Sequence, residues 1–503
     1  MILFNGRKMD MPICNGKIYK VQEGDTIVSI ARAHGVKLAR LISANPGLSN
    51  PLKLKAGEEI CIPDLGRGKS QAVDTEIGVQ IPLGYRITKT VKNLTFPSAI
   101  TFNNIGEMFV LESGYKAGNV QRPAGILKVS PDGSTTEIVR GLTPPVLGLT
   151  WHNGDFYAAE SGYPGQITRI TPSGQREVVI RGLPTGGDHG LGDVVFGPDE
   201  MMYFGLGTAT NSGVVGPDNK WLTKRPKYHD LTYRKYELAS QNFVSENSLS
   251  PATGDSAVTV AFKPFGTPGR NNQLVNKDFP CNGAVYQANP DGSGLQVYAD
   301  GLHNPFGLGF SPGGILFATD NGMDNRGSRP VNDAWDTFAE IHLGEWYGWP
   351  DYNAGVPLTD PNFMPPQGPQ PQFLIKNQPP LAAGPAAKIP PHSTPAKFSF
   401  STSSNFGYQG EAFVALYGHL YHAGELLPEP AGFSVVRINN DTGEVNDFMV
   451  ILNPGSEKGP FHPIQARFGP QGKELFIVDF GNPGDLGRPS QARTGAIWTI
   501  SKE

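Results

Sequence analysis

The chain has 503 residues, of which 42 are Lys or Arg and 46 are Asp or Glu, and its formal net charge is −4 at pH 7. This length exceeds what one small core requires and favours more than one domain, and the lack of a basic excess argues against nucleic acid as a partner. No run of about 18 apolar residues that could span a membrane occurs, and the 63 Gly and 45 Pro favour a loop-rich, mainly β protein.

The first 65 residues have the pattern of a small separate domain. Ile27, Ile30 and Ala31 recur at helical spacing, and Asp25-Thr26 can supply an oxygen that caps this helix. A second helix is predicted over residues 38–47, LARLISANPG.

The stretch from Gly16 to Pro63 resembles the LysM family over its whole length. It opens with Y-x-V-x-x-G-D-T and closes with L-x-x-G-E-x-I-x-I-P. The resemblance implies binding of glycans that contain N-acetylglucosamine, above all peptidoglycan; a scaffold of the same fold without a ligand is the alternative. The residues expected at the glycan are Gly24, Asp25, Thr26, Asn45 and Pro46.

The LysM resemblance implies a place at the cell wall or spore surface. The first 17 residues lack the long apolar segment of an ordinary secretory signal. Cys14 and Cys61 flank the LysM strands; a disulfide is open to them, but we expect two separate thiols because three cysteines make no disulfide framework. Cys281 is expected to be structural. Residues 66–82 are polar and contain Gly, and are predicted to be a linker.

Residues 83–503 contain a repeated unit of two apolar strands joined by a turn with Gly or Asn. Four of the copies continue into a third strand with its own PDG-like turn, which is typical of hairpins. Radial repetition of such units predicts a β-propeller, here with six blades. We expect Tyr85–Leu94 to complete the last blade beside Gly495–Glu503, because closure removes an open sheet edge. The six copies begin at Pro97, Pro145, His189, Asn304, Pro395 and His462.

Two insertions interrupt the repeat, at Thr210–Asn282 and at the Pro-rich segment Asp351–Pro395. Long ordered insertions on a rigid scaffold usually build the rim of a binding site. Solvent-exposed decoration is the alternative.

Three sequence blocks resemble the soluble quinoprotein glucose/sorbosone dehydrogenases. They are GLHNPFGLGF at Gly301–Phe310, DNGMDNRG at Asp320–Gly327, and Glu340-Ile341 followed by YGWP at Tyr347–Pro350. That family is a β-propeller that binds pyrroloquinoline quinone (PQQ) and calcium. The resemblance implies PQQ-dependent oxidation of a small sugar, on a propeller tethered to glycan by the LysM domain.

The resemblance also implies a general base. Asp188-His189 stands in GDHGLGDVVFGPD, where the family has D-H-x-x-G and its base. An imidazole with a near-neutral pKa can remove the proton of a sugar hydroxyl, and the adjacent carboxylate can orient it. The alternative is a tight turn that leads into a strand.

Four residues are expected at the cofactor: His303, Asn304, His462 and His419. The family commonly has Arg-Asn, Arg and Lys at these places. PQQ carries three carboxylates, so histidines should hold it less firmly, and more firmly as the pH falls and they become charged.

For calcium, the residues Asp320, Gly322, Met323 and Asp324 lie in an oxygen-rich turn, to which Glu340 can add a carboxylate. Calcium prefers carboxylate and carbonyl oxygens on flexible loops. A β-turn rich in Asp and Asn without an ion is the alternative.

Two other functions remain open. Glu112, Glu160 and Asp320 end equivalent strands and could converge around a divalent metal, as in a lactonase-like hydrolase. A propeller that has lost its cofactor contacts could instead bind carbohydrate at the wall without catalysis. The replaced basic positions favour the second alternative, whereas the DH, HNP and YGWP blocks favour the dehydrogenase, and the fold alone does not decide.

Overall fold

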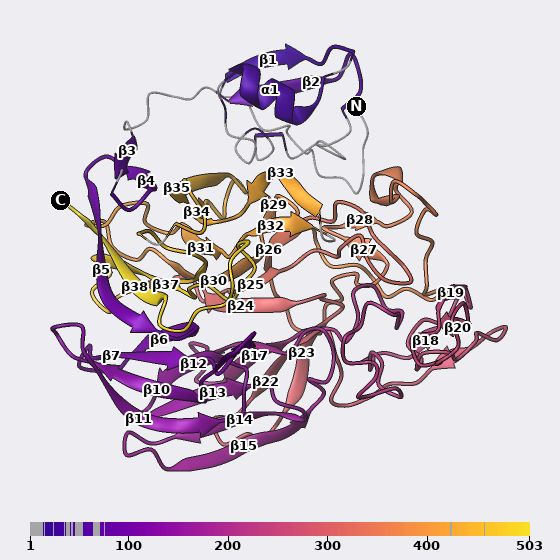
Figure 1. Cartoon of the computed structure of the whole chain (residues 1–503), viewed down its shortest axis with the longest axis horizontal. Helices are drawn as coiled ribbons and strands as arrows, with labels where there is room; N and C mark the ends of the chain where they lie inside the picture. The colour runs from indigo at the N-terminus through magenta and orange to yellow at the C-terminus, as the bar shows by residue number, and fades with distance from the viewer. Residues whose placement is uncertain are drawn as a thin grey trace.

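The computed structural model describes residues 14, 16–23, 25–34, 36, 41, 44–45, 54–63, 71–74, 76–422, 425–456 and 458–503. A small N-terminal unit with one helix lies beside a large body built from strands (Figure 1). The predicted mainly β class with a preceding α+β unit is confirmed. Within the described residues, no helix is long and apolar enough to cross a membrane.

The N-terminal unit pairs β1 (Gly16–Lys20) with β2 (Glu59–Pro63) in an antiparallel ladder, and α1 (Ile27–His34) packs against them. The predicted apolar stripe of α1 is buried with the strand residues Ile60 and Ile62. Burial of this stripe is what stabilises so short a helix. The predicted second helix falls mostly outside the described residues.

The two cysteines of the N-terminal unit form a disulfide, Cys14–Cys61, with Cα atoms 5.6 Å apart. The expectation of separate thiols is therefore wrong. Because β1 lies beside β2, the residue that leads into β1 comes within reach of Cys61. Cys281 is free and buried, as expected of a structural residue.

The large body consists of six antiparallel units of four strands each, and one parallel strand pair joins the last two units within a ten-stranded sheet. The first three are β6 (Pro97–Phe102), β7 (Met108–Glu112), β10 (Ala124–Val129) and β11 (Thr135–Leu142); β12 (Val146–His152), β13 (Asp155–Glu160), β14 (Gly165–Ile170) and β15 (Arg176–Leu183); and β16 (Leu191–Phe196), β17 (Met202–Leu206), β22 (Ala284–Ala288) and β23 (Gln296–Asp300). The next three are β24 (Pro305–Phe310), β25 (Leu316–Asp320), β26 (Asp336–Glu340) and β29 (Ala387–Ile389); β30 (Pro395–Phe400), β31 (Ala412–Leu416), β34 (Ser434–Ile438) and β35 (Val445–Ile451); and β36 (Pro463–Phe468), β37 (Glu474–Asp479), β38 (Gly495–Lys502) and β5 (Tyr85–Leu94).

The innermost strands of these sheets form a closed ring. β6, β12, β16, β24, β30 and β36 each contact the next in this order, and β36 contacts β6. The N-terminal strand β5 pairs with β38, the last strand of the chain, in register Tyr85↔Lys502. The predicted closure by Tyr85–Leu94 is thus confirmed, and the sheets are arranged as a propeller.

A short hairpin precedes the propeller. Its strands are β3 (Gln71–Asp74) and β4 (Val79–Pro82), and β4 pairs with the outer strand β35 through Val450↔Gln80. The hairpin occupies part of the segment for which the sequence predicts a linker. Only residues 64–70 connect it to β2.

The two insertions pack on each other and on the propeller. The first contributes Val214, Tyr236 and Leu238, and the second contributes Leu358 and Leu374, to one buried apolar cluster. Their short elements are β18 (Tyr236–Glu237), β19 (Asn242–Glu246), β20 (Ser256–Val260) and β21 (Leu274–Val275), and β27 (Tyr352–Asn353), β28 (Val356–Pro357) and a 3-10 helix, η1 (Pro361–Phe363). The remaining strands are β8 (Lys116–Ala117), β9 (Val120–Gln121), β32 (His419–His422) and β33 (Glu425–Ala431).

Candidate functional site

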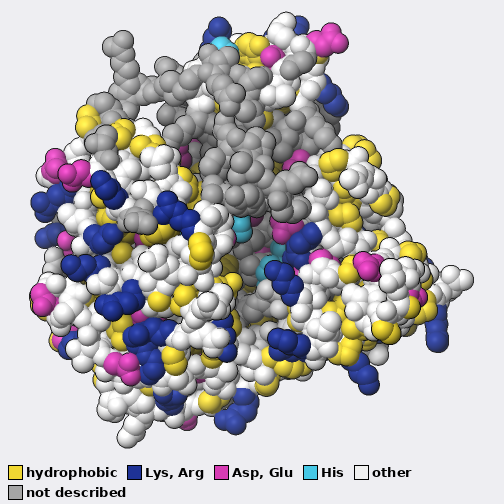
Figure 2. Space-filling model, in the orientation of Figure 1, with side chains coloured by type: hydrophobic (Ala, Val, Ile, Leu, Met, Phe, Trp, Pro, Cys, Tyr) yellow, Lys and Arg dark blue, Asp and Glu magenta, His cyan; other side chains and the backbone are white. Residues whose placement is uncertain are grey.

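A two-lobed cavity lies where the innermost strands of several sheets begin. One lobe has a volume of about 370 Å³ and the other about 400 Å³, and both are lined by His189, Asn304, Asn321, Thr394 and His419. His189, Asn304 and Thr394 precede innermost strands, whereas Asn321 follows β25. Figure 2 shows histidine side chains in a hollow near the middle of one face of the molecule.

His303 forms part of the wall of the first lobe, which we call the histidine lobe. Its side chain is 4 % exposed, and its Nδ1 lies 2.8 Å from the carbonyl oxygen of Asn321. A carbonyl only accepts, so Nδ1 carries the proton and Nε2 presents a lone pair. Nε2 is buried and has no hydrogen-bond partner among the residues that the structure describes.

His189 meets His303 edge to face, with ring centroids 4.6 Å apart. Its Nε2 is likewise buried and without a partner in the described part of the chain. Burial, with the charge of Arg326 second, lowers the pKa of His189 to about 3. Burial, with the neighbouring His189 second, lowers the pKa of His303 to about 3. Both imidazoles are therefore neutral at physiological pH, so each ring carries one acceptor nitrogen.

Asp324 is the anion of the histidine lobe. Burial alone would raise the pKa of its carboxyl, but the hydrogen bond from His392 and the charge of Arg326 hold this pKa well below its usual range. The Asp324 charge in turn raises the pKa of His392, against the effect of burial. His392 comes from the Pro-rich insertion, so this insertion forms part of the cavity wall.

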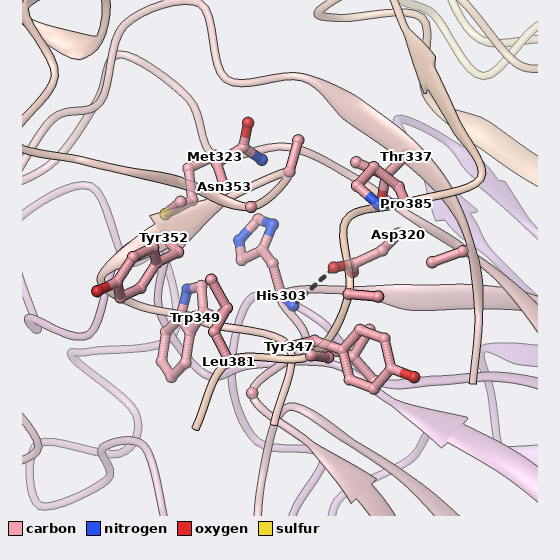
Figure 3. A pocket seen from close by; sticks show the side chains of 17 residues that line it. His303, Asp320, Met323, Thr337, Tyr347, Trp349, Tyr352, Asn353, Leu381 and Pro385 are labelled. Carbon is pink, nitrogen blue, oxygen red and sulfur yellow. Dashed lines mark hydrogen bonds between the residues drawn. The ribbon is translucent and has the colours of Figure 1, made fainter. Parts of the chain in front are cut away.

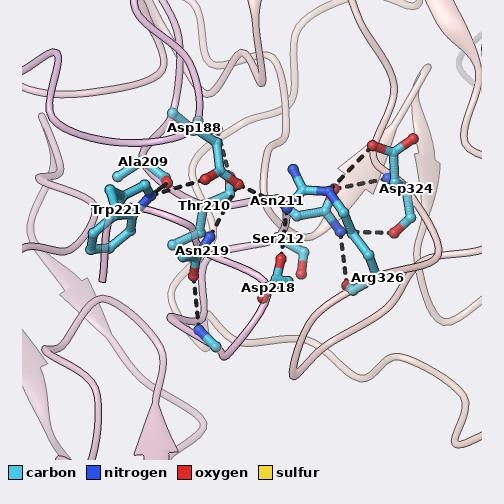
Figure 4. Close-up of polar contacts among 12 residues, drawn as sticks. Asp188, Ala209, Thr210, Asn211, Ser212, Asp218, Asn219, Trp221, Asp324 and Arg326 are labelled. Atoms are coloured by element: carbon cyan, nitrogen blue, oxygen red, sulfur yellow. Dashed lines mark hydrogen bonds and ion pairs between the residues drawn. The ribbon is translucent and has the colours of Figure 1, made fainter. Parts of the chain in front are cut away.

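The carboxylate of Asp188 does not orient His189, contrary to the prediction. It accepts hydrogen bonds from Asn219 Nδ2 at 3.0 Å, Trp221 Nε1 at 2.9 Å and Arg326 Nη1 at 2.8 Å (Figure 4). Asn219 and Trp221 belong to the first insertion. Asp188 therefore joins that insertion to the acidic turn, and His189 keeps its place through backbone pairing with Thr208.

The turn predicted to bind calcium is hydrogen-bonded to neighbouring segments of the chain. Asp320 accepts from the backbone N–H of His303 at 3.2 Å and of Asn304 at 2.5 Å, and Figure 3 shows the first contact beside a small pocket of about 40 Å³. Burial raises the pKa of Asp320 to about 7. The N–H of Gly322 donates to Asp336 at 2.7 Å. No three His, Cys, Asp or Glu side chains among the described residues are arranged to hold one metal ion.

Three further predicted site residues lie in different surroundings. The buried side chain of Met323 lines both the histidine lobe and the small pocket. Glu340 ends β26, four residues beyond Asp336, with a half-exposed side chain near His342. His462 lies in a neighbouring pocket, where its Nε2 is 3.0 Å from Asp485. Glu340 and His462 are thus not brought together with His303.

Acidic residues at the ends of the second strands brace the blades. Glu112 accepts from Thr95 N–H and pairs with Arg140 at 2.7 Å, and Glu160 accepts from Thr143 N–H at 2.5 Å. Asp320 makes the same kind of contact within its own sheet. Each carboxylate is therefore used locally, and the predicted convergence of Glu112, Glu160 and Asp320 around a metal is wrong.

The second lobe, which we call the apolar lobe, was not anticipated from the sequence. Its wall offers aromatic faces and aliphatic side chains beside the shared polar residues. The sequence contained part of the information needed to predict this lobe, because several of these residues flank the start of a repeat. The apolar lobe includes Tyr115, Leu147, Phe306, Tyr417, Ile464 and Phe480.

In the N-terminal unit, two predicted glycan residues have structural contacts. Asp25 accepts from Tyr19 Oη at 2.8 Å and from Gln22 N–H at 2.7 Å. Asn45 bonds both backbone groups of Cys61, at 2.6 and 2.7 Å. Thr26 lies exposed directly before α1, whereas Gly24 and Pro46 lie outside the described residues.

Residues 19–63 match the model of the LysM domain family. The N-terminal unit is a LysM domain. No curated protein matches the chain.

The solved structures similar to this chain have the propeller fold. The PQQ-bound aldose sugar dehydrogenase of Streptomyces coelicolor is 17 % identical, with a TM-score of 0.50 over 84 % of this chain and 99 % of that one. The PQQ domain of pyranose dehydrogenase from Coprinopsis cinerea is 14 % identical (TM-score 0.51; 86 % and 99 % covered). A family AA12 carbohydrate-active enzyme of Trichoderma reesei is 15 % identical (TM-score 0.52; 86 % and 100 %). At these identities the likeness establishes the fold.

The cavity residues do not fit PQQ. The lobes are large enough for a small organic ligand, but no Lys or Arg lines either of them in the described part of the chain. Arg326 is already paired with Asp188, Asp218 and Asp324. Three carboxylates would therefore enter a buried site where the charge of Asp324 is already matched by its partners His392 and Arg326, which is electrostatically unfavourable.

Proposed function

We propose that the central cavity binds a neutral sugar and that the LysM domain holds the protein on a glycan containing N-acetylglucosamine. The proposal rests on the Nε2 atoms of His189 and His303, which are buried and have no hydrogen-bond partner among the described residues. A buried acceptor without a partner costs free energy until a donor reaches it. Sugar hydroxyls are neutral donors, and the aromatic faces of the apolar lobe suit the C–H faces of a sugar ring.

The functions that the sequence leaves open differ in what they require of this cavity. The non-catalytic carbohydrate-binding propeller needs acceptors, a neutral ligand and no cofactor, all of which the cavity chemistry supports. The LysM domain suggests an extracytoplasmic or wall-associated site of action, and the spore surface is one such place.

A PQQ-dependent sugar dehydrogenase is the second candidate. It is favoured by the likeness of the propeller fold to a PQQ-bound aldose sugar dehydrogenase and by the free Nε2 of His189, which could accept a proton. Dye reduction by the protein with PQQ, calcium and a panel of aldoses tests it.

Replacing His303 with Phe tests the neutral-sugar proposal. The variant keeps an aromatic ring but removes the acceptor, so we expect glucose or N-acetylglucosamine to bind about 5- to 100-fold more weakly, as for one lost buried hydrogen bond. Calorimetric titration measures this. His342→Phe is the matched control, because the His342 side chain is half exposed near Glu340, and it should bind as the wild type does. Equal affinity of His303→Phe and wild type would count against the proposal.

The pH dependence of sugar binding follows from the lowered pKa values. A sugar hydroxyl can donate a hydrogen bond only to the neutral form of His189 or His303. Both side chains keep this form until the pH approaches about 3. We therefore expect affinity to stay flat between about pH 7 and pH 5, where an ordinary imidazole would become charged. The sequence predicts that PQQ binds more firmly as the pH falls. His303 should not contribute to such an increase, because it stays neutral. A loss of sugar affinity centred near pH 6.5 would show that these imidazoles titrate normally.

A further inference from the structure

We infer that the sugar bound by the central cavity is the free end of the same glycan chain that the LysM domain holds. The inference rests on the proposed function and names its substrate class: an oligosaccharide containing N-acetylglucosamine, engaged at two sites of one molecule. Three features carry it, namely the contact between the LysM core and the cavity rim, the rigidity of that rim, and the short tether.

Trp335 of the propeller packs into the apolar core of the LysM domain. This side chain is 5 % exposed and belongs to the same buried cluster as Ile27, Ile30 and Ile62, with Ala354 packed against it. In Figure 1 the LysM elements lie next to the part of the propeller that contains β29 and β32. The LysM domain is therefore seated on the propeller.

Trp335 stands at the rim of the cavity. Its neighbours in sequence, Ala334 and Asp336, both line the histidine lobe. The amide of Asn353 holds the Trp335 backbone on both sides, accepting from its N–H at 2.8 Å and donating to its carbonyl at 2.9 Å. Ala354 follows Asn353 and lines the small pocket behind His303. The surface that receives the LysM domain is thus continuous with the cavity wall.

The tether keeps the two sites together. Pro63 ends β2 and Gln71 begins β3, whose hairpin is fixed to β35 through β4. Eight residue steps, from 63 to 71, span at most about 29 Å when fully extended. A LysM domain released from Trp335 would still remain within this distance of its attachment point on the propeller.

A tether this short sets a high effective concentration at the second site, on the order of millimolar. A glycan retained by LysM therefore presents its own end to the cavity far more often than a free sugar meets it. A monosaccharide would fill one site at a time, whereas a longer chain could occupy both. Chain length should then govern affinity without any new contact.

Calorimetric titration of the full chain with N-acetylglucosamine and its hexamer tests the inference. We expect one hexamer per protein, bound at least about 100-fold more tightly than the monomer. His303→Phe should weaken hexamer and monomer binding by the same factor. Trp335→Ala should weaken hexamer binding at least about 10-fold more than it weakens monomer binding, and Trp151→Ala, on a blade distant in sequence, is its control.

Two outcomes would overturn the inference while leaving the proposed function intact. One is hexamer binding that ignores His303→Phe while monomer binding responds, because LysM alone would then hold the chain. The other is binding of two hexamers per protein. If neither saccharide responds to His303→Phe, the proposed function itself fails, and the inference with it.

Discussion

Replacing Arg329 with Met should lower the free energy of unfolding by about 3–5 kcal/mol, as expected when one partner of a buried ion pair is removed. The side chains of Arg329 and Asp351 are 2 % and 0 % exposed, and their charged atoms lie 3.2 Å apart. Arg329 also donates to the carbonyl oxygens of Ser212 at 3.1 Å and Gln372 at 2.9 Å. It thus ties the two insertions together, and its loss leaves a buried carboxylate without its cation.

Urea denaturation of the variant and the wild type measures this effect. Lys376→Met is the matched control, because Lys376 and Glu237 form an exposed pair, and such pairs contribute about 0–1 kcal/mol. A similar small change in both variants would mean that Asp351 is satisfied by its backbone contacts with Leu374 and Ile375. The sugar affinity of Arg329→Met should also fall, since the second insertion carries His392 into the cavity wall.

Replacing Cys14 with Ser should destabilise the LysM domain by about 4 kcal/mol, from the loop-closure entropy of a disulfide that joins residues 47 apart. A domain this small has little apolar core to offset such a loss. We expect glycan retention to fall at elevated temperature while the propeller melts as before. Reduction of the wild type should reproduce the effect, and unchanged glycan retention after reduction would show that the disulfide is dispensable.

The propeller could be predicted from sequence because each blade repeats a local pattern. The copies at Pro97, Pro145 and Asn304 each became an innermost strand and its hairpin partner. The closing strand Tyr85–Leu94 could be predicted because the last strand had no other partner. The Cys14–Cys61 bond could not be, since it depends on how the chain enters β1.

The cavity was only partly predictable. His189, His303 and Asn304 line one lobe, because equivalent positions of a propeller converge on its axis. The partner of Asp188 was missed, since Arg326 lies 138 residues away along the chain. His392 was missed because it stands in a Pro-rich segment without periodicity. Glu340 was misplaced because a strand of five residues separates its two ends by more than a ligand's reach.

The balance of charge distinguishes this cavity from a site for an anionic cofactor. An Arg at position 303 would carry a fixed charge at any physiological pH, whereas a buried His remains neutral. Arg326, a cation near the lobe, is held by acidic residues. Neutral hydroxyls fit such a site, because they satisfy acceptors without adding charge.

One calorimetric comparison tests the neutral-sugar cavity most directly: the same sample of wild-type protein at neutral pH, titrated with N-acetylglucosamine and, separately, with PQQ in the presence of calcium. We expect saturable sugar binding that His303→Phe weakens, and no saturable binding of PQQ. Saturable PQQ binding accompanied by aldose-dependent dye reduction, with no binding of the sugar alone, would contradict this and establish the dehydrogenase instead.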